Sequence, residues 1–289
     1  MATEELERAP GTVALLAKAA LGVLPGVRRR GGTGLPDTEL VLPGITVDAG
    51  HLAAYARVCG FGVRDELPLT YPHVLAFPLA LRLMTDGSFP FPMIGLVHLR
   101  NAITRHRPLL VTDRFGLRVR CADLRPHDRG TQFDVIHEAT VDGEVVWRDV
   151  STYLRRGGTA SRQTQAHEER PAPATAVWRV GDDIGRRYAA VSGDHNPIHL
   201  HPLAARALGF RRAIAHGMWT KARCLAALEG RLPAAYTAEV AFKLPVFLPA
   251  KVAFDAAQRD GGWRFDLRDA RSGKPHLTGS VTAVAARAT

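Results

Sequence analysis

The hydrophobic and polar positions of this chain follow patterns that predict both helices and strands. Ala and Leu recur at helix-compatible spacing in residues 203–208 and 213–228, so we expect helices there. Runs of strand character stand on either side of Gly-containing turns, which is typical of β-hairpins. These runs are residues 133–140 and 144–154 around Asp142-Gly143, and residues 263–269 and 276–284 around Ser272-Gly273. The pattern therefore predicts one hairpin in each half of the chain.

The same order of segments occurs twice along the chain. Residues 55–60, with the sequence YARVCG, match residues 188–193, with YAAVSG, at an offset of 133. A second pair, residues 107–110 and 244–247, matches around a proline at an offset of 137. Each proline segment precedes a stretch of strand character, residues 114–121 in the first half and 251–256 in the second. Duplication explains this shared order better than chance similarity between small apolar residues.

A polar stretch separates the two units. Residues 157–174 are rich in Gly, Arg, Gln, Glu and Pro and have no hydrophobic periodicity, which indicates a linker. We therefore expect an N-terminal unit at residues 1–156 and a C-terminal unit at residues 175–289. The first unit also contains an apolar stretch, residues 13–23, which is interrupted by Lys18 and is too short to span a bilayer. We expect a short helix there, packed on the body of the protein.

Composition narrows the class of protein. The 289 residues are 46% hydrophobic and 23% charged, as in an ordinary globular protein. The formal net charge of +10 comes from scattered arginines, which reflect either a bias of the host genome or attraction to an anionic ligand. The sequence has no zinc-finger spacing, aromatic RNA-binding motif or compact basic helix, so we expect no nucleic-acid partner.

Cysteine usage and the N-terminus bear on the compartment. The three cysteines lie far apart without a C-x-x-C pair, which argues against a disulfide framework and against a structural zinc site. The chain starts with acidic residues where a signal peptide would be basic. We therefore expect a cytoplasmic protein without a membrane span.

Residues 188–218 hold the densest set of side chains that can do chemistry. Asp194 and His199 are separated by Asn196-Pro197, and because proline disrupts a helix we expect both on a loop, where polar side chains converge on a cavity. A carboxylate beside an imidazole can exchange a proton at neutral pH, as general acid–base catalysis requires. Taken alone, the same spacing also fits a helix-capping Asp194 and a structural His199.

The same segment has the composition of a metal site but not its spacing. The side chains that could act as ligands are Asp194, His195, His199, His201 and His216. Pro197 breaks the helix on which an i, i+4 pair would stand, and no H-E-x-x-H motif is present. We expect no metal and no cofactor.

These residues belong to a longer pattern that resembles the MaoC-like (R)-specific enoyl-CoA hydratases and 3-hydroxyacyl-thioester dehydratases, especially the longer actinobacterial ones. The resemblance rests on Tyr188, Ser192-Gly193-Asp194, Asn196-Pro197-Ile198-His199, Ala204-Ala205, Gly209-Phe210 and Ile214-Ala215-His216-Gly217-Met218, followed by Phe242-Lys243, Pro245, Phe247 and Pro249. It implies an α+β fold of the double-hotdog type. In that fold two tandem hotdogs, each a central helix wrapped by an antiparallel sheet, pair through their sheets.

The resemblance also implies a reaction and the roles of four residues. The reaction is reversible hydration of trans-2-enoyl thioesters, or dehydration of (R)-3-hydroxyacyl thioesters, in fatty-acid metabolism. Asp194 and His199 would hold the catalytic water and shuttle protons, and Asn196 would orient them. The backbone N–H of Gly217 would bond the thioester oxygen, since a donor at a helix start can stabilise the charge that develops there. Gly217 has an alternative interpretation as a tight packing point.

The first half departs from this pattern. Phe61 stands where Asp194 would recur, and residues 62–67 contain no N-P-x-H. Near the counterpart of His216-Gly217-Met218 stands Phe77-Pro78-Leu79, and a proline has no N–H to donate. We therefore expect this half to be catalytically silent. Its apolar stretch, residues 71–91, either lines space for the acyl chain or is ordinary core.

Two other functions fit the same sequence features. One is a hotdog acyl-thioesterase, which would activate water against the thioester carbonyl, and the other is a non-catalytic acyl-thioester-binding subunit. The expected partner in each case is an acyl-CoA or an acyl carrier protein thioester, and a homodimer is a further expectation. Basic residues near the motif are either phosphate contacts or solvated side chains: Arg211, Arg212, Lys221 and Lys243.

Overall fold

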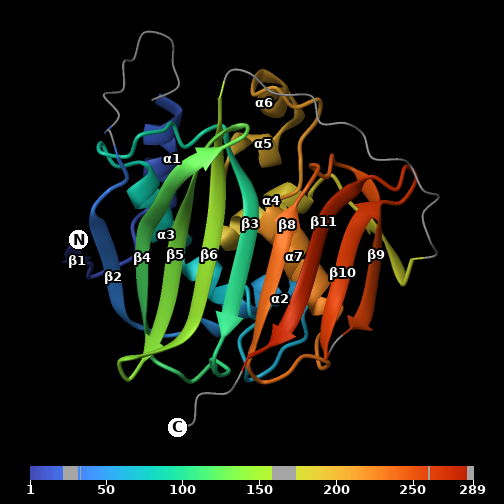
Figure 1. Cartoon of the computed structure of the whole chain (residues 1–289), viewed down its shortest axis with the longest axis horizontal. Coiled ribbons are helices and arrows are strands. Elements are labelled where there is room, and N and C mark those ends of the chain that lie inside the picture. The colour runs from blue at the N-terminus through green and yellow to red at the C-terminus, as the bar shows by residue number, and fades with distance from the viewer. Residues whose placement is uncertain (22–31, 33, 158–173, 260, 285–289) are drawn as a thin grey trace.

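The first half of the chain forms helices and a set of strands that pair antiparallel, except that the first two strands pair with each other in parallel. The structure, a computed structural model, describes residues 1–21, 32, 34–157, 174–259 and 261–284 (Figure 1). The helices of this half are α1 (Thr12–Leu21), α2 (Ala49–Cys59) and α3 (Tyr71–Met84). Its strands are β1 (Ala2–Glu5), β2 (Thr38–Ile45), β3 (Leu96–Arg105), β4 (Phe115–His127), β5 (Gly130–Val141) and β6 (Glu144–Arg156). The predicted first hairpin is confirmed as β5 and β6, and the strand predicted at residues 114–121 as the first part of β4.

The second half repeats this plan. Its helices are α4 (Ile184–Ser192), α5 (Pro197–Leu200), α6 (Pro202–Ala207) and α7 (Gly217–Ala226). Its strands are β7 (Ala176–Val180), β8 (Tyr236–Phe242), β9 (Ala250–Arg259), β10 (Gly262–Asp269) and β11 (Pro275–Ala283). The predicted second hairpin is confirmed as β10 and β11, and the strand predicted at residues 251–256 as part of β9.

All of these strands lie in one sheet, in the order β1-β2-β4-β5-β6-β3-β8-β11-β10-β9-β7. The middle of the sheet is the antiparallel pair β3 and β8, which joins the halves from Arg100 opposite Ala241 to Arg105 opposite Tyr236. Figure 1 shows the sheet in front and the central helices behind it, with α3 against β4 and β5 and α7 against β10. The predicted α+β double-hotdog fold is confirmed.

The two segments that match in sequence take the same structure. Each forms the C-terminal part of a helix, α2 or α4, and each helix is capped by a glycine in the left-handed conformation, Gly60 with φ 85° and Gly193 with φ 71°. Only glycine adopts this conformation without strain. The matching tyrosines, Tyr55 and Tyr188, are both buried, and their ring centroids lie 6.3 Å apart. The two copies therefore meet at the centre of the molecule.

The N-terminal apolar stretch forms the expected short helix. In α1, Leu15 and Leu16 pack against the hydrophobic core and Ala19 is buried within it. Residues 22 and 23 of the predicted segment lie outside the described residues. Among the residues that the structure does describe, no helix has the length and apolar character needed to cross a membrane.

One sequence-based prediction, the helix at residues 213–228, needs correction, and another, the linker, lies almost wholly outside the described residues. The helix predicted at residues 213–228 begins only at Gly217, because Ile214 forms a β-bridge with Phe247 and the N–H of Ala215 donates to the carbonyl of Val246. These contacts hold the preceding residues in an extended conformation. The linker lies almost wholly outside the described residues, so the boundaries at 156 and 175 stay predictions.

Candidate active site

The loop after α4 places the carboxylate of Asp194. Past Gly193, the N–H of Asp194 donates to Ser192 Oγ at 3.2 Å. The Asp194 Oδ1 accepts from the N–H of Asn196 at 3.1 Å. Asn and Asp side chains form such local bonds to the backbone of turns, which fix both the chain and the side chain. The carboxylate is therefore held in one orientation while its side chain remains 28% exposed.

The next turn places His199, on a short helix and not on the loop that we expected. Asn196 is the N-cap of α5, its Oδ1 accepting from the N–H of Ile198 at 3.4 Å, and Pro197 occupies the first helical position. Proline is tolerated there because that N–H has no helical partner. Pro197 therefore begins a helix instead of breaking one, and it places His199 in that helix. Asp194 does lie on the loop.

The hydrogen bond that His199 makes decides its tautomer. Its Nδ1 lies 2.8 Å from the carbonyl oxygen of Ile214, which can only accept, so Nδ1 carries the proton. The Nε2 is then left with a lone pair in the neutral ring. Burial lowers the pKa of His199, while the charge of Asp194 and the bond to Ile214 oppose that shift. His199 is therefore a neutral base at neutral pH.

His216 ties the two catalytic candidates together. Its Nε2 donates to the carbonyl of Asp194 at 2.9 Å, and its ring stacks on that of His199 with centroids 3.7 Å apart. Burial, with a further contribution from His199, lowers its pKa to about 3, so it stays neutral. From the sequence, His216 is only a motif residue and a candidate metal ligand. The contact that reveals its role joins residues 22 positions apart, which no local pattern indicates.

Gly217 begins α7 and presents its N–H at the N-terminus of that helix. Within the described residues this N–H meets no acceptor, as expected for the first turn of a helix. A Cβ at this position would lie 3.1–3.3 Å from three carbon atoms of the Phe242 ring. Both interpretations of Gly217 therefore describe its surroundings: the residue packs tightly, and its N–H is free to bind a ligand.

A cavity of about 490 Å³ connects these groups with the first half of the chain. Asp194, Asn196, His199 and Gly217 all line it, so the structure brings the four predicted site residues together. From α3 the cavity is lined by His73, Val74, Phe77 and Met84. The predicted lining stretch is thus partly lining and partly core, since other α3 side chains such as Leu79 and Leu81 are fully buried.

The start of α3 offers no comparable donor. Phe77-Pro78-Leu79 lies inside α3 and not at its start, so its proposed correspondence to His216-Gly217-Met218 is wrong. The helix begins at Tyr71, whose N–H donates to the carbonyl of Pro68 at 2.8 Å. Pro72 follows and has no N–H. Comparing the two halves at a fixed offset could not locate the start of α3, because the turn that precedes it sets that start.

The basic residues near the motif differ in their burial and in their contacts. Lys243 is exposed and lines the cavity, and Arg212 is exposed. Arg211 lies over the ring of Phe247 at 4.2 Å. Lys221 is fully buried, so neither a phosphate contact nor solvation describes it.

Among the residues that the structure describes, two clusters contain side chains that could hold a metal ion. One is Asp194, His199 and His216, and the other is His73, His137 and Asp149; in each, the possible ligand atoms lie within 4.8 Å of one another. In the first cluster one nitrogen of each histidine is already bonded to a carbonyl. That leaves His199 Nε2, His216 Nδ1 and the carboxylate as the atoms available to a metal. The expectation of no metal and no cofactor stays a prediction.

A carboxylate, an imidazole and a free helix N–H thus meet at one cavity between two fused hotdogs, as the resemblance to the hydratase and dehydratase class implies. Comparisons with known proteins agree: the family model of the MaoC like domain matches residues 161–279. The 3-hydroxyacyl-thioester dehydratase X of Mycobacterium tuberculosis is 42% identical over 277 residues, which cover 94% of this chain and 98% of that protein.

Solved structures show the same relation. The crystal structure of HtdX of Mycobacterium tuberculosis matches with a TM-score of 0.77 and 41% identity, over 85% of this chain and 100% of that one. The crystal structure of a MaoC-like dehydratase from Phytophthora capsici has the same fold, with a TM-score of 0.70 at 18% identity over 89% of this chain and 98% of that one. The chain belongs to the MaoC-like dehydratase family, and the resemblance seen in the sequence is confirmed.

Proposed function

We propose that this protein catalyses the reversible hydration of trans-2-enoyl thioesters and dehydration of (R)-3-hydroxyacyl thioesters. The observation that carries the proposal is the convergence of a carboxylate, a neutral imidazole and a free helix N–H on one cavity. The 3-hydroxyacyl-thioester dehydratase named above supports it through its identity over nearly the whole chain. An acyl thioester is therefore the proposed substrate.

The N–H of Gly217 would bind the thioester oxygen. Negative charge grows on that oxygen when the C2 proton leaves, so a preoriented donor there stabilises the transition state more than the bound substrate. The partial positive charge at the start of α7 acts in the same direction. The absence of a side chain at Gly217, enforced by Phe242, lets the oxygen approach closely.

Asp194 and His199 would move the proton. In dehydration the C2–H bond breaks, its electrons form the C2–C3 double bond, and the C3–O bond breaks to release the hydroxyl, which takes up a proton to leave as water. The net result is the transfer of one proton from C2 to the departing oxygen, through Asp194 and His199. His199 Nε2 carries a lone pair to accept this proton, and the adjacent Asp194 stabilises the imidazolium that forms. Hydration is the same path in reverse, with the pair holding the water.

Asn196 would act as an orienting residue. In the sequence it lies between Asp194 and His199. It caps the helix that carries His199 and lines the cavity. The first half would be catalytically silent and would supply one wall of the acyl site through α3.

The carrier of the acyl group is either coenzyme A or an acyl carrier protein. Both present phosphate groups, and Arg129, Arg156 and Lys243 line the cavity as possible contacts. The cytoplasmic location, the setting in fatty-acid metabolism and the homodimer come from the sequence and stay predictions.

The decisive experiment follows the ultraviolet absorbance of crotonyl-CoA and of a longer trans-2-enoyl-CoA. We expect wild-type protein to lower the enoyl absorbance and to form the (R)-3-hydroxy product. We expect Asp194→Asn to lose at least about 100-fold in rate, the scale of general acid–base catalysis. His195→Gln is the matched control, because His195 is an exposed neighbour whose Nδ1 contacts only the carbonyl of Gly193.

The same assay separates the alternatives. Release of free thiol without a hydroxyacyl product would indicate a thioesterase. Binding without any turnover, unaffected by Asp194→Asn, would indicate a non-catalytic acyl-thioester-binding subunit. Either result would contradict the proposal.

A further inference from the structure

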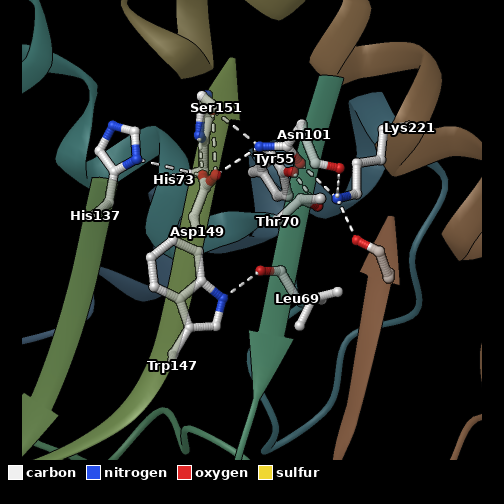
Figure 2. A network of polar contacts seen from close by, with 11 residues as sticks. Tyr55, Leu69, Thr70, His73, Asn101, His137, Trp147, Asp149, Ser151 and Lys221 are labelled. Carbon is white, nitrogen blue, oxygen red and sulfur yellow. Dashed lines mark hydrogen bonds and ion pairs between the residues drawn. The ribbon is translucent and has the colours of Figure 1, made fainter. Parts of the chain in front are cut away.

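A buried ammonium group lies one helical turn after the proposed thioester-binding donor. Lys221 is fully buried in α7, four residues after Gly217, and its side chain points toward the sheet (Figure 2). Its Nζ donates to Asn101 Oδ1 at 2.5 Å, to the carbonyl of Asn101 at 3.3 Å and to the carbonyl of Ala238 at 2.8 Å. These acceptors lie on β3 and β8, the two strands that join the halves.

The network continues into the first half of the chain. Asn101 Nδ2 donates to Asp149 Oδ1 at 2.6 Å, and Asp149 Oδ2 lies 2.5 Å from His73 Nδ1. Ser151 Oγ accepts from Asn101 Nδ2 at 2.9 Å and lies 3.2 Å from Asp149 Oδ1. One chain of polar contacts thus runs from α3 through β6 and β3 to α7 (Figure 2).

The network contains buried titratable groups of opposite kinds, a carboxylate and an amine. Burial lowers the pKa of Lys221 to about 7, while Asp149 and Glu239 act in the opposite direction. Burial by itself would raise the pKa of Asp149, but His73 and His137 hold it at about 2. Such burial is costly, and an apolar side chain of similar volume would often be at least as stable in the position of Lys221. What the three hydrogen bonds of Lys221 Nζ do provide is one well-defined arrangement.

The part of the molecule that this arrangement fixes is the first turn of α7. Gly217 and Lys221 are one turn apart, about 6 Å along the helix axis. The Thr220 Oγ1 donates to the carbonyl of Gly217 at 2.6 Å, which stiffens the same turn. A shift of Lys221 is therefore passed on to the N–H of Gly217, and a misplacement of about 1 Å can reduce a rate by about 100-fold.

We propose that Lys221 is a positioning residue for the reaction, and that the silent half of the chain holds it in place through Asn101 and Asp149. The buried Lys221 side chain anchors α7 to the junction of the halves. It thereby positions the Gly217 N–H to donate a hydrogen bond to the thioester oxygen. This inference rests on the proposed function of Gly217. It assigns the silent half a part in catalysis besides enclosing the acyl chain.

The test compares wild-type protein with Lys221→Met, which keeps the length of the side chain and removes its charge and bonds. We expect kcat for crotonyl-CoA hydration to fall by about 10- to 100-fold while KM changes by less than about threefold, because the oxyanion contact strengthens mainly in the transition state. A second readout is the infrared carbonyl band of bound butyryl-CoA labelled with ¹³C at the thioester carbon. We expect the bound-state shift of this band to shrink in the variant.

Thr104→Val is the matched control. The Thr104 and Thr237 hydroxyls share a hydrogen bond of 2.8 Å across the same β3 and β8 junction, but neither contacts α7 through it. We expect this variant to lower the unfolding temperature while kcat and the carbonyl band stay at wild-type values. If Lys221 had only a structural role, kcat and the carbonyl band of folded Lys221→Met would stay at wild-type values, as in Thr104→Val.

The outcomes are distinct. Wild-type kcat and an unchanged carbonyl band in folded Lys221→Met would overturn the inference, as would equal loss of kcat in Thr104→Val. If Lys221→Met does not fold, Asn101→Ser, which removes the shortest acceptor of Lys221 and keeps both backbone carbonyls, decides the question by the same readouts. A wild-type protein without turnover would contradict the proposed function instead, and the carbonyl band would still report on Lys221.

Discussion

Gly185 lies outside the recognised motif, yet it packs directly against the backbone of His199, the proposed catalytic base. It is buried in the first turn of α4, and a Cβ built on it would overlap the carbonyl oxygen of His199 and lie 3.0 Å from the carbonyl carbon. Alanine would otherwise be favoured at a helical position by about 1 kcal/mol. Because the obstructing atom is backbone, relief requires α5 to move away from α4.

The magnitude follows from the size of this overlap. To reach ordinary contact distance, α5 must shift by on the order of 1 Å, and overpacking of this kind costs about 1–3 kcal/mol. The same shift moves His199 Nε2 relative to Asp194, and misplacement on this scale costs about 100-fold in rate. We therefore expect Gly185→Ala to lower both the unfolding temperature and kcat, and Gly185→Ser to do so more strongly.

The assay is enoyl-CoA hydration beside thermal unfolding, with Gly87→Ala as the matched control. A Cβ at Gly87 meets nothing within 4 Å, so this variant should behave as wild type. The reasoning would be refuted by a Gly185→Ala protein whose kcat and unfolding temperature equal those of Gly87→Ala.

Three further results are expected. Gly217→Ala should lower kcat by about 10-fold or more with little change in KM, because the methyl group meets the Phe242 ring and displaces the N–H. Steady-state kinetics measure both constants, and a change in KM alone would contradict this prediction. Stability to urea should fall from pH 6.5 toward pH 4, because burial lowers the pKa of His98 to about 3 and of His137 to about 4, so that the unfolded chain takes up protons that the folded chain excludes. Each such histidine contributes up to about 1.4 kcal/mol per pH unit in that window, and equal stability at both ends would refute the argument. Dialysis against EDTA should leave the hydration rate unchanged; loss of activity that zinc restores would show that the site holds a metal.

The two halves illustrate how a duplicated unit diverges. Each keeps a tyrosine-containing helix with a glycine cap, and the structures of these segments agree. Only the second keeps an N-P-x-H turn and a glycine at the start of its central helix. In the first, Tyr71 and Pro72 occupy that start, and a buried network around Asp149 fills the region beneath α3.

The sequence by itself determined the features that depend on neighbouring residues. The hairpins follow from strand character and turn chemistry, and the duplicated plan follows from repeated order. The prediction of Asp194, Asn196, His199 and Gly217 as site residues came from resemblance to a family motif and not from spacing alone. The helix start at Gly217 was decided by a tertiary contact, since the strand-like bond between Ala215 and Val246 outweighs local helix propensity. The helix start at Pro197 is local, because Asn196 caps it two residues ahead of Ile198, although from the sequence Pro197 was expected only to break a helix.

Only the tertiary structure decided how distant parts of the chain act together. The roles of His216, Gly185 and Lys221 depend on contacts with Asp194, His199 and Asn101, which lie 14 to 120 positions away in the chain. A local pattern carries no information on such contacts, because they form only when the chain folds back on itself. The contact of Lys221 with Asn101 also requires β3 and β8 to join the halves into one sheet. The same junction closes the cavity and fixes its buried charges, so the environment of each catalytic group is a property of the assembled fold.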